Sequence, residues 1–245
     1  MQLNTTADAV RYYVKAYNAT KKETAKYQNK ETDEILTYYK LLGVKTLSAD
    51  NVYINGGRNK FMDSYLDSMI SDTKVGTGLP PCTAVEKSED TDLNGKSLVT
   101  SRLRDTDVET LSIKDNKNGT VTLTIKPKSV QMSSPGADAQ GRFFSTLGPM
   151  YDTFDQMLKQ NGGKWTTGNA KKNLHMNYTG GTGTITINTS SGKITKATYN
   201  MKVNVDVQHV SISGMKDQRV QLRVIVKDTF PMSQELFDSS NLERL

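Results

Sequence analysis

The residues best suited to proton transfer or metal binding are scarce and scattered in this sequence. Its two histidines, His175 and His209, lie far apart and lack the HxxxH or HxH spacing that would place two imidazoles on one metal ion. His209 falls where an alternating apolar pattern changes parity, between Val207 and Val210. Such a change favours a histidine at a β-bulge or a sheet edge. The sequence therefore predicts no metal site and no catalytic histidine.

Carboxylates offer another route to catalysis. Asp105, Asp107 and Glu109 could supply the two carboxyl groups that a glycosidase needs. At the junction between a loop and a strand, however, such side chains are more often solvated. There is no GxSxG motif, and Cys82 has no neighbouring histidine in the sequence. A carbohydrate-active enzyme is therefore the third hypothesis for function, and the preferred prediction is that the protein is not an enzyme.

Three glycine-containing stretches partly match motifs that bind phosphate, dinucleotides or calcium, but each lacks a residue or element that its motif requires. In "NGKS", Asp90 stands where a phosphate-binding loop needs its first glycine. "GGTGT", which begins at Gly180, leads into a predicted strand, whereas a dinucleotide site needs a helix there. "DNKNG" has Lys117 and Gly119 where a calcium loop needs oxygen ligands. We expect no cofactor.

The composition indicates a folded protein outside the bacterial cytoplasm. The 245 residues are 35% hydrophobic, and the apolar ones are patterned rather than scattered. A single cysteine excludes a disulfide framework, and Thr, Asn, Ser, Gly and Lys dominate the polar positions. "MQLNTTADAV" lacks the basic start and apolar core of a signal peptide, so an exported protein would have lost its leader. We expect an extracellular or cell-surface location and a monomer.

The charge allows some partners and disfavours others. The net charge is +6 and the pI about 9.2, which permits attraction to anionic polymers or lipid surfaces. The basic residues are interleaved with acidic ones and form no arginine-rich run, so we expect no nucleic-acid binding. The sequence contains no run of about twenty apolar residues, so we expect no membrane-spanning segment.

Apolar residues at helical spacing predict three helices. The first covers residues 6–25, with Thr5 as N-cap and Asp8 completing a capping box. The second covers residues 58–71, and the third covers residues 143–159, with a new start at Pro149. Residues 33–42 suit either a helix or a strand, and their Thr and paired Tyr favour a strand.

Strands occupy most of the remaining chain. "DVETLSIK" and "GTVTLTIK" flank the turn "DNKNG" as a hairpin, and long alternating stretches run from Leu174 to Val226. Residues 72–96 show neither period and contain two prolines and a charge run, which predicts a long surface loop. Helices and strands are segregated along the chain. We therefore predict an α+β fold with a long, strongly curved antiparallel sheet packed on two to three amphipathic helices.

We expect one domain over residues 1–245, which could divide internally into residues 1–135 and 136–245. The stretch "ATYNMKVNVDVQ" shows how its sheet is built, because every second residue from Ala197 to Val207 is apolar. The three helices could cover this apolar face completely. They could also leave space for a ligand, because the helix faces are rich in methionine and aromatic residues. The candidate lining residues are Phe61, Met62, Tyr65, Met69, Phe143, Phe144, Met150, Phe154, Met157, Tyr199, Met201 and Val203.

The block "INTSSGKITKATYNMKVNVDV" resembles a stretch common in exported proteins of Gram-positive bacteria. The order of helices and long strands is similar to that of tubular lipid-binding proteins of the bactericidal/permeability-increasing type, and less closely to that of periplasmic lipoprotein carriers. The resemblance implies an apolar ligand but carries no motif, so no binding residue is transferred from it.

Two non-catalytic hypotheses therefore precede the enzyme. The first is that the protein binds an apolar or amphipathic, lipid-like ligand between sheet and helices. The second is a cell-surface module whose polar sheet face, around Lys202 and Asn204, or whose 72–96 loop contacts a surface protein or wall polymer.

Overall fold

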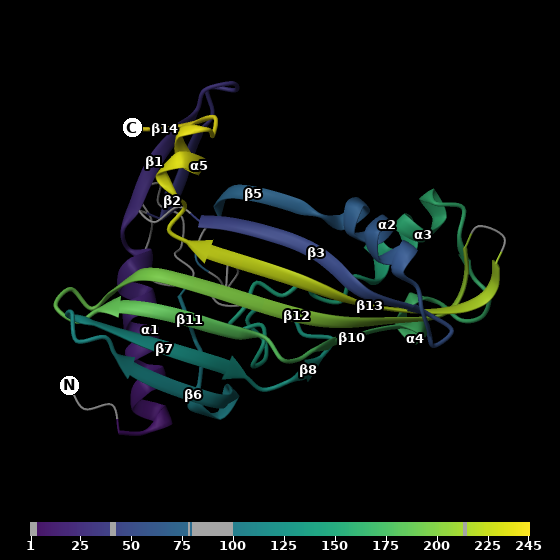
Figure 1. The fold of residues 1–245 in the computed structure, drawn as a ribbon, viewed down its shortest axis with the longest axis horizontal. Helices are drawn as coiled ribbons and strands as arrows, with labels where there is room; N and C mark the ends of the chain where they lie inside the picture. Colours follow the sequence, from purple (N-terminus) through teal and green to yellow (C-terminus); the bar gives the residue numbers. More distant parts are fainter. Residues whose placement is uncertain (1–3, 40–42, 78, 80–99, 213–214) are drawn as a thin grey trace.

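The alternating stretch of the C-terminal third forms one long hairpin at the centre of the molecule (Figure 1). β12 (Lys193–Ile212) and β13 (Met215–Phe230) pair antiparallel along most of their length. In the computed structural model, residues 4–39, 43–77, 79, 100–212 and 215–245 are described. Within them the fold is α+β with a large antiparallel sheet, as the sequence predicts.

The main sheet contains eleven of the described strands. Seven form its continuous path in the order β4-β3-β13-β12-β11-β7-β6, while β10 and β9 pair with β12, β8 with β10 and β5 with β3. Their bounds are β3 (Gly43–Ile54), β4 (Gly57–Arg58), β5 (Asp72–Thr77), β6 (Val108–Asp115), β7 (Thr120–Pro127), β8 (Val130–Gln131), β9 (Lys164–Trp165), β10 (Leu174–Tyr178) and β11 (Thr182–Asn188).

One face of this sheet, called the inner face here, carries the core. Tyr199, Met201 and Val203 point into it and are buried, as the alternation predicts. Helix α1 (Thr6–Lys21) packs against it, crossing behind the strands in Figure 1. The hydroxyls of Tyr13 on α1 and Tyr199 on β12 lie 2.9 Å apart in a buried hydrogen bond.

Helix α1 begins as predicted and ends earlier. The Thr5 hydroxyl accepts from the backbone N–H of Asp8, which confirms the predicted N-cap. The helix stops at Lys21, and the residues from Thr24 form a strand, so the prediction of a helix to residue 25 was too long. For residues 33–42 the sequence favours a strand over a helix, and strand β2 (Ile35–Tyr39) confirms this, with residues 40–42 outside the described residues.

Helix α2 (Lys60–Ile70) confirms the second predicted helix but docks at the edge of the sheet. Its Asp67 and Asp63 carboxylates accept the backbone N–H groups of Ala49 (2.8 Å) and Val52 (2.6 Å) on β3. The prediction that all three helices cover the apolar face is therefore wrong for α2.

The third predicted helix is shorter than expected. Helix α3 (Tyr151–Gln160) begins only after Pro149, and Phe143 and Phe144 lie in the preceding turns. Both rings are buried and meet edge to face at 4.9 Å between centroids. The turns are fixed by the Asp138 carboxylate, which accepts from the Ser133 hydroxyl and from backbone N–H groups of the same segment.

Part of the predicted 72–96 loop is a strand. Its first six residues form β5, which pairs with β3. Beyond Leu79 the described chain resumes at Thr100, so most of that prediction lies outside the described residues. At His209 the prediction is confirmed, because the β12–β13 register shifts between Val207 and Val210 and His209 has a φ of 53°.

A second, smaller sheet projects from one end of the main sheet (Figure 1). It contains β1 (Thr24–Asn29), β2 and β14 (Leu242–Arg244) in the order β14-β1-β2, beside helix α5 (Gln234–Asp238). Tyr27, Met232 and Leu242 form its own buried core. The described helices are completed by α4 (Ala170–Asn173) and a 3-10 turn at Asp105–Asp107.

Candidate functional site

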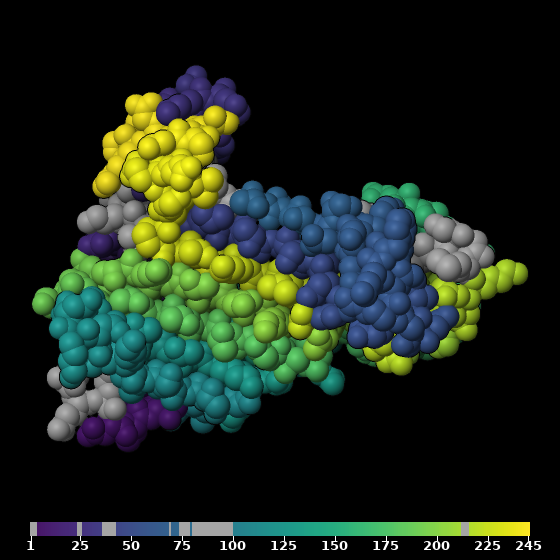
Figure 2. Space-filling model, in the orientation of Figure 1, coloured from purple at the N-terminus to yellow at the C-terminus, as the bar shows by residue number. Residues whose placement is uncertain are grey.

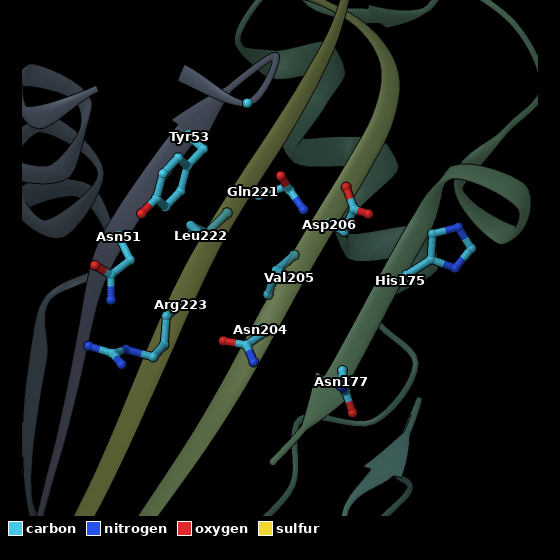
Figure 3. Close-up of a pocket in the computed structure, with 11 residues that line it drawn as sticks. Asn51, Tyr53, His175, Asn177, Asn204, Val205, Asp206, Gln221, Leu222 and Arg223 are labelled. Carbon is cyan, nitrogen blue, oxygen red and sulfur yellow. The ribbon is translucent and has the colours of Figure 1, made fainter. Parts of the chain in front are cut away.

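The candidate site is a depression of about 650 Å³ on the outer face of the main sheet, opposite α1. Figure 2 shows this face, with the blue residues of β3 and α2 beside the yellow-green to yellow residues of β13, and the green residues of β12 beyond them. The side chains of the depression come from β10, β12, β13 and β3 (Figure 3). The lining residues are Asn51, Tyr53, Gly56, His175, Asn177, Asn204, Val205, Asp206, Gln221, Leu222 and Arg223.

Strand register explains why these side chains meet. One cross-strand row runs from His175 through Asp206 and Gln221 to Tyr53. Directly opposed residues in antiparallel strands have Cβ atoms about 5 Å apart, so each side chain is in reach of the next.

The neighbouring row lies two residues along β10, β12 and β13, and three along β3, where the register shifts. It runs from Asn177 through Asn204 and Arg223 to Asp50. Side chains two residues apart share one face of a strand, so the two rows form a polar surface four strands wide.

The charged groups of the depression are already paired. The Arg223 guanidinium donates two hydrogen bonds to Asp50, at 2.8 and 2.5 Å. Arg219 donates two to Asp206, at 2.9 and 2.7 Å. The hydrogen bonds from Arg219 are the main reason that the pKa of Asp206 lies below its ordinary value.

Three amides in the depression remain available. Among the described residues, the side chains of Asn177, Asn204 and Gln221 have no hydrogen-bond partner. A primary amide offers two N–H donors and one carbonyl acceptor. The depression therefore presents several donors and acceptors to a ligand without a free charge among them.

Tyr53 forms one wall of the depression and is fixed from behind. Its side chain is exposed, and the Arg58 guanidinium lies 5.4 Å from its ring centroid. Arg58 is itself held by hydrogen bonds to Asn51 and to the Asp63 carboxylate on α2. Asn51 has a φ of 56° and lies at an irregularity in the β3–β13 pairing. Such an irregularity bends a strand locally and so sets the direction of this end of β3.

The one carboxylate that lines the depression, among the residues described, is poorly suited to act as a general acid. This carboxylate, Asp206, has a lowered pKa, whereas a general acid near neutral pH needs a raised one. Asp228 has the opposite shift but lies on the inner face, away from the depression. Within the described ranges, no cluster of three or more His, Cys, Asp or Glu side chains could hold a metal ion.

The three carboxylates considered for a glycosidase differ in burial and in hydrogen-bond partners. Asp107 is buried and accepts two hydrogen bonds from the Arg142 guanidinium, at 2.8 and 2.7 Å. Asp105 and Glu109 are exposed, and Glu109 pairs with Lys126. Asp107 therefore anchors the turn that contains Phe143.

The twelve candidate lining residues do not form one continuous lining. Tyr199, Met201, Val203, Phe143 and Phe144 are buried in the core, and Met150 and Phe154 pack against it. Phe61, Tyr65 and Met157 are exposed, Met62 is half-buried, and the Met69 side chain is outside the description. Because α2 faces β3 with Asp63 and Asp67, its Phe61 and Tyr65 point to solvent. The prediction that they line an internal site is wrong.

Sequence reasoning found the polar face but not the depression. Asn204 belongs to the polar face singled out from the alternation, yet Tyr53, His175 and Gln221 lie far from it in the chain. The available signal was the polar alternation in each strand. It could not give the pairing of β3 with β13, which brings Tyr53 to Gln221.

No described helix is both long and apolar enough to cross a membrane. No protein-family model, curated protein or solved structure matches this chain.

Proposed function

We propose that the protein is a non-catalytic binding module that holds a cell-wall polymer on the outer face of its main sheet. The observation that carries the proposal is the set of three unpaired amides, on β10, β12 and β13, that converge on one depression. Side-chain amides on a sheet surface are usually isolated from one another and hydrogen-bonded to water. Here strand register places them beside an aromatic ring and two internally paired arginines, which is a pre-organised polar surface.

The shape of the depression suits an extended ligand. It crosses four strands, a distance of about 14 Å at the usual spacing between strands. The proposal includes the strong curvature expected of strands as long as β12 and β13, because bending turns a polar face into a shallow channel. It also includes the exported, cell-surface location, where wall polymers are found.

The apolar-ligand hypothesis stays a prediction. The space between α1 and the sheet is occupied by packed rings, since Phe143 contacts Tyr13 at 5.6 Å and Tyr199 at 5.4 Å between centroids. A second depression, of about 500 Å³, has apolar walls at Val10, Val14 and Leu103, but it lies between α1 and residues 103–105. An apolar ligand on the inner face would have to displace the ring cluster.

Co-sedimentation with purified, insoluble bacterial cell wall tests the proposal. Wild-type protein should sediment with the wall, and the double variant Asn204→Ala with Gln221→Ala should lose most of this binding. Both residues lie outside the core, so thermal stability should change by less than about 0.5 kcal/mol for each.

A matched control is the double variant Thr124→Ala with Thr184→Ala, on the outer face of β7 and β11. It should bind the wall like wild type. Equal binding by wild type and the amide variant would remove the depression as the binding site.

A further inference from the structure

We infer that the ligand held in this depression is an uncharged, hydroxyl-rich glycan, and that Tyr53 is the surface on which a sugar ring packs. The inference rests on the proposed function and specifies its ligand. It runs against the net charge of +6, which by itself favours an anionic polymer.

Charge pairing disfavours an anionic ligand. Each arginine at the depression is already engaged by both oxygens of a carboxylate, Arg223 by Asp50 and Arg219 by Asp206. A phosphate or carboxylate on the ligand would have to compete with these bidentate pairs and would approach two negative side chains. The excess positive charge of the chain therefore lies elsewhere than in this site.

The unpaired groups match hydroxyls. A sugar hydroxyl both donates and accepts a hydrogen bond, and each of Asn177, Asn204 and Gln221 can do the same through its amide. Asn177 and Asn204 are directly opposed on β10 and β12, so their amides can contact neighbouring hydroxyls of one ligand. His175, at the end of the other row, adds ring nitrogens that can also form hydrogen bonds.

Tyr53 supplies the apolar surface that sugar rings need. Tyr53 is 37% exposed although it stands on a paired strand, and the Arg58 guanidinium lies against its ring. A fixed aromatic side chain gives a large contact area at little cost in conformational entropy. Asn177 on β10 and the Tyr53 ring on β3 come from the two outer strands of the depression, and Asn204 and Gln221 lie on the strands between them (Figure 3). A chain of linked sugars could therefore contact both at once.

Isothermal titration calorimetry with two kinds of probe tests the inference. The first is a panel of neutral oligosaccharides built from glucose, mannose, galactose or N-acetylglucosamine, and the second is poly(glycerol phosphate). At least one neutral oligosaccharide should bind, and its Kd should change less than about twofold when NaCl rises from low to high concentration, since no counterions are released. Tyr53→Ala should weaken binding about tenfold. Tyr53→Phe, which keeps the ring, should bind within about twofold of wild type.

The outcomes separate this inference from the function on which it rests. Binding to poly(glycerol phosphate) alone, with an affinity that falls as salt rises, would overturn the uncharged glycan and leave the wall-binding module standing. Failure of every probe together with failure to sediment with cell wall would overturn both. If Tyr53→Ala melts at a lower temperature, the Asn204→Ala and Gln221→Ala pair, which leaves β3 unchanged, still tests whether the neutral oligosaccharide binds in the depression.

Discussion

Lys45 and Asp228 oppose each other on β3 and β13, with the lysine Nζ 3.6 Å from the aspartate Oδ1, on the inner face of the sheet. Asp228 is only 4% exposed, and its Oδ1 accepts no hydrogen bond within the described residues. Burial raises the pKa of Asp228 to about 6, and Lys45 offsets only part of this effect.

This raised pKa makes stability depend on pH with a defined sign. The folded protein binds the Asp228 proton more tightly than the unfolded chain does. The contribution of Asp228 to stability is therefore fully present below about pH 4 and is lost as the pH rises through about 6. Asp228→Asn removes the titration. In urea unfolding, the stability of the variant minus that of wild type should increase by about 2 kcal/mol between pH 4 and pH 7.5.

A second variant gives the opposite sign. The pKa of Asp206 is lowered, mainly by its hydrogen bonds from Arg219, so its contribution is present above about pH 4 and is lost in acid. Asp206→Asn should therefore be less stable than wild type at pH 7, with a deficit that shrinks as the pH falls. The same pH trend for both variants would contradict the assignment of Asp228 as a buried, proton-binding group.

The buried hydrogen bond between Tyr13 and Tyr199 predicts a coupled pair. Both rings are fully buried, so Tyr13→Phe or Tyr199→Phe alone leaves one hydroxyl without a partner and should cost about 1–3 kcal/mol of unfolding free energy. The double variant should cost less than the sum of the two. Tyr12→Phe, on the same helix and only partly buried, is the control and should cost little. Strict additivity in this double-mutant cycle would show that the two hydroxyls do not interact.

The contact of α2 with the edge of β3 predicts that breaking it will expose the backbone of β3 locally. Asp67→Ala removes the acceptor of the Ala49 N–H and should lower stability by about 1–2 kcal/mol. Hydrogen exchange at Ala49 should become faster, because its amide then lacks a protein partner. Ser64→Ala, on the exposed side of α2, should leave that rate unchanged. Unchanged exchange in Asp67→Ala would mean that α2 is not held through this bond.

Local patterns in the sequence predicted the structural features that depend on residues close together in the chain. The Thr5 cap, the hairpin around "DNKNG", the long β12–β13 pair and the bulge at His209 all follow from the spacing of side chains and from turn residues. Within β3, the sequence indicates an extended conformation only for "NVYING", because "GVKTLSAD" alternates only weakly. Its strand conformation depends on pairing with β13 and β5, which are distant in the sequence.

The candidate site was harder to predict for the same reason. Helical spacing correctly marked Phe61 and Tyr65 as one face of α2, but spacing does not say which face meets the protein. The carboxylates of Asp63 and Asp67 decide this by binding backbone groups of β3. Likewise, the depression exists only because register aligns Tyr53, Gln221 and Asp206 across three strands.

A two-dimensional ¹H–¹⁵N NMR titration with soluble cell-wall fragments tests the central claim most directly. We predict that the amide signals that shift belong to the residues of the depression, above all Tyr53, Asn177, Asn204 and Gln221, and that those of α1 stay in place. Shifts confined to the inner face, at Tyr199, Met201 and Val203, or to the exposed side of α2 would contradict a binding site on the outer face of the sheet.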